Sequence, residues 1–323
     1  MARARGKIGG CRAAVLGAAG LGLTAAFTAL RPGGEGEIRE VLLRSAALIA
    51  DAGAAAGLTE PTPAEPTPGW DISNIDHHRV DYWIRRFQTD KRDDFVVYLA
   101  RKGRYEPLIS RALAEKQMPQ DLVYLAMIES GFDPKAYSRA HASGLWQFIG
   151  GTARRYGLDI NRAVDERNDP VKATEAALEY LSDLYDRFGS WYLAAAAYNS
   201  GENRITRILR QAYGRTRGTD RDYYRIWGRL PPETRDYVPL MVAAARIDKD
   251  PGRYGFTGIE PHAPWSFAEV VARPATPLRT LARNAGVSLK DLKALNPHLK
   301  LNRTRNDEPM VVRVPAAEPL AAD

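Results

Sequence analysis

One glutamate in this chain stands where its carboxyl group could act as a general acid. The segment 121–131 reads DLVYLAMIESG, and helical spacing places Glu129 on the same face as Leu122 and Leu125, with Gly131 set to end the helix. Burial on such a face raises the pKa of a carboxyl group, and the negative end of the helix dipole adds about 0.3–1 kcal/mol in the same direction. The pattern therefore predicts that Glu129 keeps its proton at neutral pH, as a general acid must. On the pattern alone, a glutamate at the exposed, fraying end of a surface helix is the alternative.

Short motifs accompany this glutamate in a fixed order. They are Glu129-Ser130, Ser138, the sequence GLWQF at 144–148 and the sequence AYNSGE at 197–202. Together they resemble the lytic transglycosylases of peptidoglycan, within the goose-type lysozyme-like glycoside hydrolase family 23. Further segments are similar to the membrane-bound lytic murein transglycosylase D type, at 165–167, 186–191 and 230–239. The resemblance extends over residues 79–315 and implies a lysozyme-like α-helical catalytic domain.

The resemblance also implies a reaction. Glu129 would protonate the oxygen that links MurNAc to GlcNAc and then serve as base, while the MurNAc C6 hydroxyl attacks its own anomeric carbon with help from the N-acetyl group. A 1,6-anhydro sugar results and no water is consumed, because the nucleophile is held on the substrate. Hydrolysis of the same bond ordinarily needs two carboxylates. Asp133 would be a possible second one, although we favour a capping role in the turn before Pro134.

The same resemblance assigns roles to further residues. Tyr198 would position the Glu129 carboxyl group, and Ser138 and Gln147 would hold the N-acetyl group and ring substituents near the reacting carbon. Asn199 is a weaker candidate for substrate binding. The structural alternative is that Tyr198 and Asn199 merely finish a buried helix and that Gln147 faces solvent.

The chain departs from the family pattern at several positions. His141 stands where the family usually has glycine, and its bulk could narrow the cleft or change backbone angles that glycine tolerates. Gly150 replaces a usual proline, and Asp133 stands where asparagine is common. Tyr237 belongs to the last matched segment, and a purely structural role for it stays open. None of these changes removes Glu129. We therefore expect them to alter the reaction rate and the sugar subsites rather than to abolish activity.

The N-terminal part has the composition of an export segment. Basic residues precede an uncharged, largely apolar run at 13–30, so we expect 1–30 to be a signal peptide or a membrane anchor, both of which the length allows. Residues 31–69 are expected to form a juxtamembrane helix and a linker that reads TEPTPAEPTP at 59–68. The predicted location is the periplasm or cell envelope, with anchoring to the inner membrane left open.

Helical periodicity continues over 70–255, the expected catalytic domain, and changes near its end. In the C-terminal unit, 256–323, strand-like residues flank two short helices within 278–297. The helices alone resemble a DNA-binding helix-turn-helix. Because the flanking strands and the export segment oppose that interpretation, we favour a small α+β LysM-like unit that binds peptidoglycan and expect no nucleic-acid partner.

Composition narrows the chemistry further. The chain has 46 Lys plus Arg against 39 Asp plus Glu, a net charge of +7, and its single cysteine, Cys11, excludes a disulfide framework and a cysteine zinc site. His262 and His298 have no partner at metal-ligand spacing, and His77-His78 cannot chelate, so no metal or cofactor is expected. The leading hypothesis is a lytic transglycosylase acting on glycan strands. The alternatives are a muramidase and a catalytically inactive peptidoglycan-binding scaffold.

Overall fold

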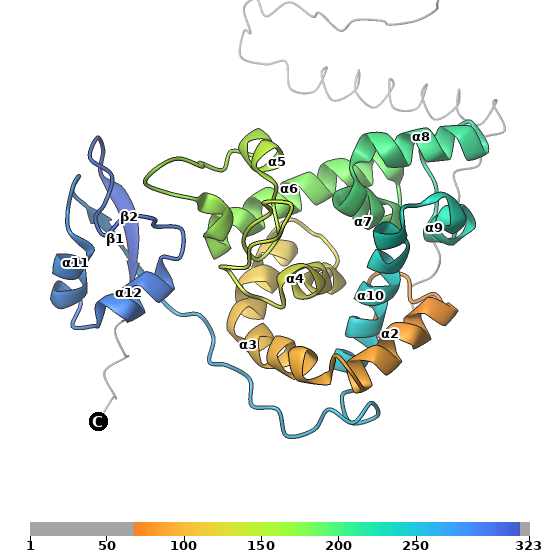
Figure 1. Cartoon of the computed structure of the whole chain (residues 1–323), viewed down its shortest axis with the longest axis horizontal. Helices are drawn as coiled ribbons and strands as arrows, with labels where there is room; N and C mark the ends of the chain where they lie inside the picture. Colours follow the sequence, from red (N-terminus) through yellow and green to blue (C-terminus); the bar gives the residue numbers. More distant parts are fainter. Residues whose placement is uncertain (1–67, 317–323) are drawn as a thin grey trace, which may run out of the picture. The chain divides into compact units, whose positions relative to one another are not determined.

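The computed structural model of the chain describes residues 68–316. The predicted export segment, 1–30, and all but the end of the predicted linker, 31–69, lie outside the described residues, as does the tail at 317–323. The expectation of a mainly α chain with a small C-terminal α+β unit is confirmed for the described part (Figure 1). Within residues 68–316, no helix combines the length and the apolar character needed to cross a bilayer.

A helical body extends from α2 to α10. Its α-helices are α2 (His78–Gln88), α3 (Arg92–Glu115), α4 (Val123–Ser130), α5 (Gly150–Arg155), α6 (Pro170–Phe188), α7 (Trp191–Ser200), α8 (Glu202–Tyr213), α9 (Asp220–Ile226) and α10 (Pro232–Lys249). Short 3₁₀ turns lie at η1 (Gln120–Leu122), η2 (Glu166–Asn168) and η3 (Trp227–Arg229). Helix α7 packs against α6, α8, α9 and α10, so it is the centre of this body.

The sequence explains why α7 can occupy the centre. Residues 192–197 are all buried, and the run of alanines at 194–197 lets neighbouring helices approach closely. Ser190 starts the helix by accepting a hydrogen bond from the Leu193 N–H, which satisfies one free backbone donor. Gly189, at φ 68°, ends the preceding helix in the left-handed conformation that glycine favours. The capping residues thereby fix the position of the AYN segment at the C-terminal end of α7.

Helix α4 is short and apolar, as expected of an interior helix. Its residues 123–127 are buried, and α4 packs against α3 and α10 (Figure 1). The helix ends at Gly131, which has φ 58°. A Cβ atom at this glycine would lie 2.1 Å from the Tyr98 ring, so a larger residue does not fit. Glu129 therefore lies in the last turn of α4, as the sequence predicts.

The C-terminal unit is an antiparallel strand pair with two helices. Strand β1 (Ala268–Ala272) pairs with β2 (Met310–Val314), and α11 (Leu278–Asn284) and α12 (Leu289–Leu295) lie between them in sequence. Leu278, Leu292 and Val312 belong to its separate small core. Buried Asn296 links α12 to β2 by donating to the Leu292 and Arg313 carbonyls and accepting from the Arg313 N–H. The strands that favoured a LysM-like unit over a helix-turn-helix are present.

Candidate active site

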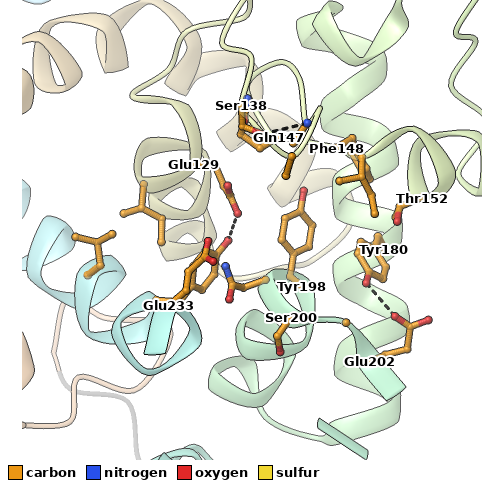
Figure 2. A pocket seen from close by; sticks show the side chains of 18 of the residues that line it. Glu129, Ser138, Gln147, Phe148, Thr152, Tyr180, Tyr198, Ser200, Glu202 and Glu233 are labelled. Atoms are coloured by element: carbon orange, nitrogen blue, oxygen red, sulfur yellow. Dashed lines mark hydrogen bonds between the residues drawn. The ribbon is translucent and has the colours of Figure 1, made fainter. Parts of the chain in front are cut away.

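A cavity of about 830 Å³ opens in the helical body (Figure 2). Residues of α2, α4, α5, α6, α7, α8 and α10 and of the loop before α5 line it. All the residues that the sequence singles out for the site are among them: Glu129, Ser138, Gln147, Tyr198 and Asn199. Helix packing thus brings together motifs that are far apart in the sequence.

Glu129 has the electrostatic environment of a general acid. Its side chain is half-buried, and desolvation raises the pKa of its carboxyl group to about 7. The negative charge of Glu233 acts in the same direction, whereas a hydrogen bond from Tyr237 lowers the pKa. No cation forms an ion pair with Glu129 within the described part of the chain. At neutral pH the group can therefore both give and take a proton.

The hydrogen bond to Glu129 comes from a different tyrosine than the resemblance implies. Tyr237 of α10 donates to the Glu129 Oε1 atom at 2.5 Å. Tyr198 of α7 instead donates to the Trp146 carbonyl oxygen at 2.7 Å. The structure thus assigns the hydrogen bond on Glu129 to Tyr237, and the positioning role expected of Tyr198 stays a prediction. Tyr198 still lines the cavity (Figure 2). Its hydrogen bond to Trp146 joins the 144–148 segment to α7.

Ser138 and Gln147 belong to a tightly bonded loop. The Ser138 Oγ atom accepts a hydrogen bond from the Ala142 N–H at 3.1 Å. The Gln147 side-chain amide donates to the Ala136 and Gly144 carbonyls, at 3.1 and 2.9 Å. These contacts orient Gln147 from within the loop, at a backbone φ of 47° that L-residues seldom adopt. The Ser138 hydroxyl keeps its proton available for an acceptor in the cavity.

Arg167 holds this loop in place through hydrogen bonds to its backbone. Its guanidinium group donates to the His141 carbonyl at 2.7 Å and to the Phe148 carbonyl at 3.1 Å. Gly144 has φ 86°, and a Cβ atom there would lie 1.8 Å from the Arg167 carbonyl oxygen. The loop requires glycine at this position for both reasons. The GLWQF motif is thus explained by backbone packing as well as by its glutamine.

Asn199 and Glu233 join the AYN segment to α10. The Asn199 Oδ1 atom accepts a hydrogen bond from the Thr234 hydroxyl at 2.8 Å, so part of its polar capacity is used between helices. Glu233 is exposed and lines the cavity one turn before Tyr237 (Figure 2). The sequence motif at 230–239 contains Glu233 and Tyr237. Sequence reasoning did not assign either of them to the site, because their distance from Glu129 depends on how α10 packs.

The departures from the family pattern leave the cavity open. His141 has φ 60°, is exposed, and its Nδ1 atom lies 2.7 Å from the Tyr137 hydroxyl. It does not line the cavity, whereas Ala140 and Ala142 beside it do. Asp133 also lies outside the cavity lining, and its Oδ1 atom accepts from the Lys135 N–H at 2.9 Å. The capping role favoured for Asp133 fits this contact.

A second glutamate lines the cavity in a contrasting environment. Glu202 lies with Tyr180 and Thr152 on the far side of Tyr198 from Glu129 (Figure 2). Arg155 donates to its Oε1 atom at 2.9 Å, and the Tyr180 hydroxyl lies 3.2 Å from its Oε2 atom. The hydrogen bond from Arg155 holds the pKa of the Glu202 carboxyl group below its usual range. Glu202 is thus held as an anion.

We searched the described residues for side chains that could together bind a metal ion. Among residues 68–316, no group of three or more His, Cys, Asp or Glu side chains is placed to hold a metal ion. His298 lies against Asp169 and Arg313, with its Nδ1 atom 3.3 Å from an Asp169 carboxylate oxygen. The polar side chains that line the cavity carry carboxyl, hydroxyl, amide and guanidinium groups.

Two family models match successive parts of the chain. Residues 106–220 match the transglycosylase SLT domain, and residues 266–319 match the LysM-like domain of lytic transglycosylase MltD. The chain is 37% identical over 208 residues to the membrane-bound lytic murein transglycosylase D of Escherichia coli strain K12, an alignment that covers 64% of this chain and 45% of that protein. It is 30% identical over 146 residues to the soluble lytic murein transglycosylase of the same strain, covering 43% of this chain and 22% of that protein.

A solved structure gives a partial match. The 70 kDa soluble lytic transglycosylase of Escherichia coli overlaps with a TM-score of 0.38 at 28% identity, covering 48% of this chain and 25% of that one. The chain spans less than half the length of the two curated relatives described above. The resemblance expected from the sequence motifs is confirmed by the family models and by the identity to lytic murein transglycosylases. Residues 106–220 are thus similar to the transglycosylase SLT domain, and residues 266–319 are similar to the LysM-like domain of lytic transglycosylase MltD.

Proposed function

We propose that the chain is a peptidoglycan lytic transglycosylase that cleaves the β-1,4 bond between MurNAc and GlcNAc without water. The observation that carries the proposal is the Glu129 carboxyl group, whose pKa is raised to about 7 where it borders the cavity. A group with this pKa has both protonation states populated near neutral pH. It can therefore act as acid in one step and as base in the next.

The proposed reaction needs one such group. Glu129 gives its proton to the glycosidic oxygen, the bond from that oxygen to the MurNAc C1 atom breaks, and the N-acetyl carbonyl oxygen bonds to C1. The Glu129 carboxylate then takes the proton of the MurNAc C6 hydroxyl as its oxygen displaces the N-acetyl group from C1. A 1,6-anhydro ring closes, and Glu129 regains its starting proton. The second step is intramolecular, so orientation supplies much of its rate.

Neighbouring residues would support these steps in different ways. Tyr237 would hold the Glu129 carboxyl group through the 2.5 Å hydrogen bond. Ser138 and Gln147 would face the N-acetyl group and ring substituents from the locked loop. Asn199 would act mainly by joining α7 to α10, given its bond to Thr234.

A muramidase is the second candidate, because Glu233 supplies a further carboxylate at the cavity, near enough for its charge to raise the pKa of Glu129. Such a carboxylate could activate a water molecule. Mass spectrometry of products from purified murein separates the two functions. The transglycosylase releases anhydro-muropeptides, whereas a muramidase releases reducing-end products that are heavier by one water. Exclusively hydrated products would refute the proposal.

The third hypothesis, an inactive scaffold, predicts that wild type and Glu129→Gln bind murein equally and that neither releases products. Under the proposed function, Glu129→Gln loses lysis and keeps binding. We further propose that the protein acts in the periplasm or cell envelope, with 1–30 as a cleaved signal or an inner-membrane anchor. The LysM-like unit at 266–319 would bind glycan strands. N-terminal sequencing of the mature protein distinguishes the signal from the anchor.

A further inference from the structure

One wall of the cavity is formed mainly by α2 and α10, two helices outside the segment matched by the SLT domain model, 106–220. Trp83 of α2 lines the cavity together with Ile128 of α4 and with Asp236 and Leu240 of α10. Asp236 and Leu240 lie on the same face of α10 as Glu233 and Tyr237, so this wall continues directly from the surroundings of Glu129.

The Trp83 indole presents carbon atoms to the cavity. Its Nε1 atom is buried and has no hydrogen-bond partner among the described residues, so the ring borders the open space with its apolar part. The Tyr82 ring packs edge-on against it at 5.3 Å, and Phe87 lies 6.3 Å away between ring centres. Phe87, which is buried, and Tyr82, which is half-buried, hold the indole in place. A fixed aromatic surface of this kind suits the apolar C–H face of a pyranose ring.

A carboxylate is fixed beside this aromatic surface. Arg79, one helical turn before Trp83, donates from Nε and Nη2 to the two Asp236 carboxylate oxygens at 2.7 and 2.6 Å. The guanidinium carbon of Arg79 also lies 3.9 Å from the centre of the Tyr82 ring. This bidentate pair joins α2 to α10 and orients Asp236. Each carboxylate oxygen retains capacity for another hydrogen bond from a sugar hydroxyl or amide.

We propose that Trp83 and Asp236 form an additional saccharide subsite of the cavity. The subsite rests on the proposed function for its ligand class, a β-1,4-linked N-acetylhexosamine residue of a glycan strand beyond the two residues that meet at Glu129. The indole receives the C–H face of the ring, and the Asp236 carboxylate accepts hydrogen bonds from its polar edge. Neither contact requires a stem peptide, so the subsite selects for glycan length.

The test measures binding of peptide-free glycan oligosaccharides of increasing length to the full chain with Glu129→Gln. Affinity is expected to increase when the oligosaccharide becomes long enough to reach Trp83. Trp83→Ala is expected to remove that increase, a loss of about tenfold for the longer ligands, since 1.4 kcal/mol corresponds to tenfold. Asp236→Asn is expected to lower the same affinity about threefold and to leave the shortest ligand unaffected.

Tryptophan fluorescence distinguishes a subsite from a structural role. Trp83→Phe preserves an apolar ring and is expected to abolish the change in emission that the longer ligands cause. Trp191→Phe is the matched control, because Trp191 stacks on Tyr185 at 4.2 Å and does not line the cavity. This control is expected to retain the emission change.

The possible failures are separable. If Trp83→Ala binds long and short ligands as the parent does and Trp83→Phe keeps the emission change, the subsite is refuted, even where wild type still releases anhydro products. If wild type releases no such products but the length-dependent step still requires Trp83, the proposed function fails and the subsite stands. Circular dichroism and thermal melts of each variant verify that it is folded.

Discussion

Two glutamates line the same cavity and have opposite electrostatic environments. Glu129 lies half-buried in the last turn of α4, where desolvation and the helix dipole both disfavour an anion, and its pKa is raised to about 7. Glu202 is the first residue of α8, where the dipole favours an anion, and Arg155 holds its pKa below the usual range. Residue type is therefore a poor guide to function within this cavity. Desolvation, the nearest cation and the position along a helix give the two carboxyl groups opposite pKa shifts.

The largest expected effect is on activity. Glu129→Gln removes the proton donor while keeping a side chain of the same shape, so we expect turnover of murein to fall by about 10²–10⁴-fold. Glu202→Gln removes a charge that does no proton transfer in the proposed reaction, and we expect a change of about threefold or less. Release of soluble muropeptides measures both. Equal losses in the two variants would contradict the assignment of the acid.

Stability should respond to pH in opposite directions at the two glutamates. The pKa of Glu129 rises from 4.5 to about 7 on folding, so its contribution to the free energy of unfolding is complete below pH 4.5 and is lost as pH rises to about 7. Gln cannot ionise, and Glu129→Gln should therefore be more stable than wild type at pH 8 by about 2–3 kcal/mol. Near pH 4 this difference should disappear.

The control for this measurement is Glu202→Gln. Because the pKa of Glu202 is lowered, its charge stabilises the fold above the ordinary pKa and ceases to do so as pH falls. The variant should thus be slightly less stable than wild type at pH 8 and equal to it in acid. Urea titrations at the two pH values give both differences. A Glu129→Gln protein that is less stable at pH 8 would show that Glu129 is not the desolvated group.

The alkaline limb of the pH–rate profile should move in opposite directions in two variants beside Glu129. Rate should fall as pH rises through about 7, because the acid loses its proton. Tyr237→Phe removes a hydrogen bond that lowers the pKa, so the limb should shift to higher pH. Glu233→Gln removes a charge that raises the pKa, so the limb should shift to lower pH. Steady-state rates between pH 5 and 9 measure both shifts. If the limb moved in the same direction in both variants, the opposite effects assigned to Tyr237 and Glu233 would be contradicted.

The sequence predicts the position of Glu129 in the fold, because the signals for that position are local. An apolar helical stripe and Gly131 place the carboxyl group in the last turn of α4, and the structure has it there. The motif order also predicts which segments meet in the cavity. Helical caps and glycines with positive φ, such as Gly144, also depend on the geometry of a few neighbouring residues, so they can be predicted from local sequence.

The partner of Glu129 could not be predicted in the same way. The choice between Tyr198 and Tyr237 depends on where two hydroxyl groups arrive after α7 and α10 pack on α4. Tyr237 is 108 residues from Glu129 in sequence, and no local pattern encodes which hydroxyl is within 2.5 Å. Trp83 was missed for the same reason, since α2 reaches the cavity only through its packing on α10. Long-range helix packing determines this part of the site.

The smallest expected effect concerns Arg155, the cation that contacts Glu202 and has no counterpart at Glu129 among the described residues. Arg155→Met leaves Glu202 at the start of α8 with the Tyr180 hydroxyl nearby, but removes the 2.9 Å hydrogen bond from Arg155. The Arg155 side chain is 54% exposed, so the pair should stabilise the fold by about 0.2–1 kcal/mol. The pKa of Glu202 should rise yet stay below that of Glu129, because the helix dipole and Tyr180 still favour its anion.

A carbon-13 NMR titration of the Glu202 carboxyl group measures this shift. Arg154→Met is the matched control, since Arg154 is the neighbouring arginine on α5 and its guanidinium group contacts the Gly150 carbonyl rather than a carboxylate. It should leave the Glu202 titration unchanged. If Arg155→Met brought the pKa of Glu202 to that of Glu129, the cation alone would separate the two glutamates. A modest rise instead assigns the remaining difference to burial and to the opposite ends of α4 and α8 that the two side chains occupy.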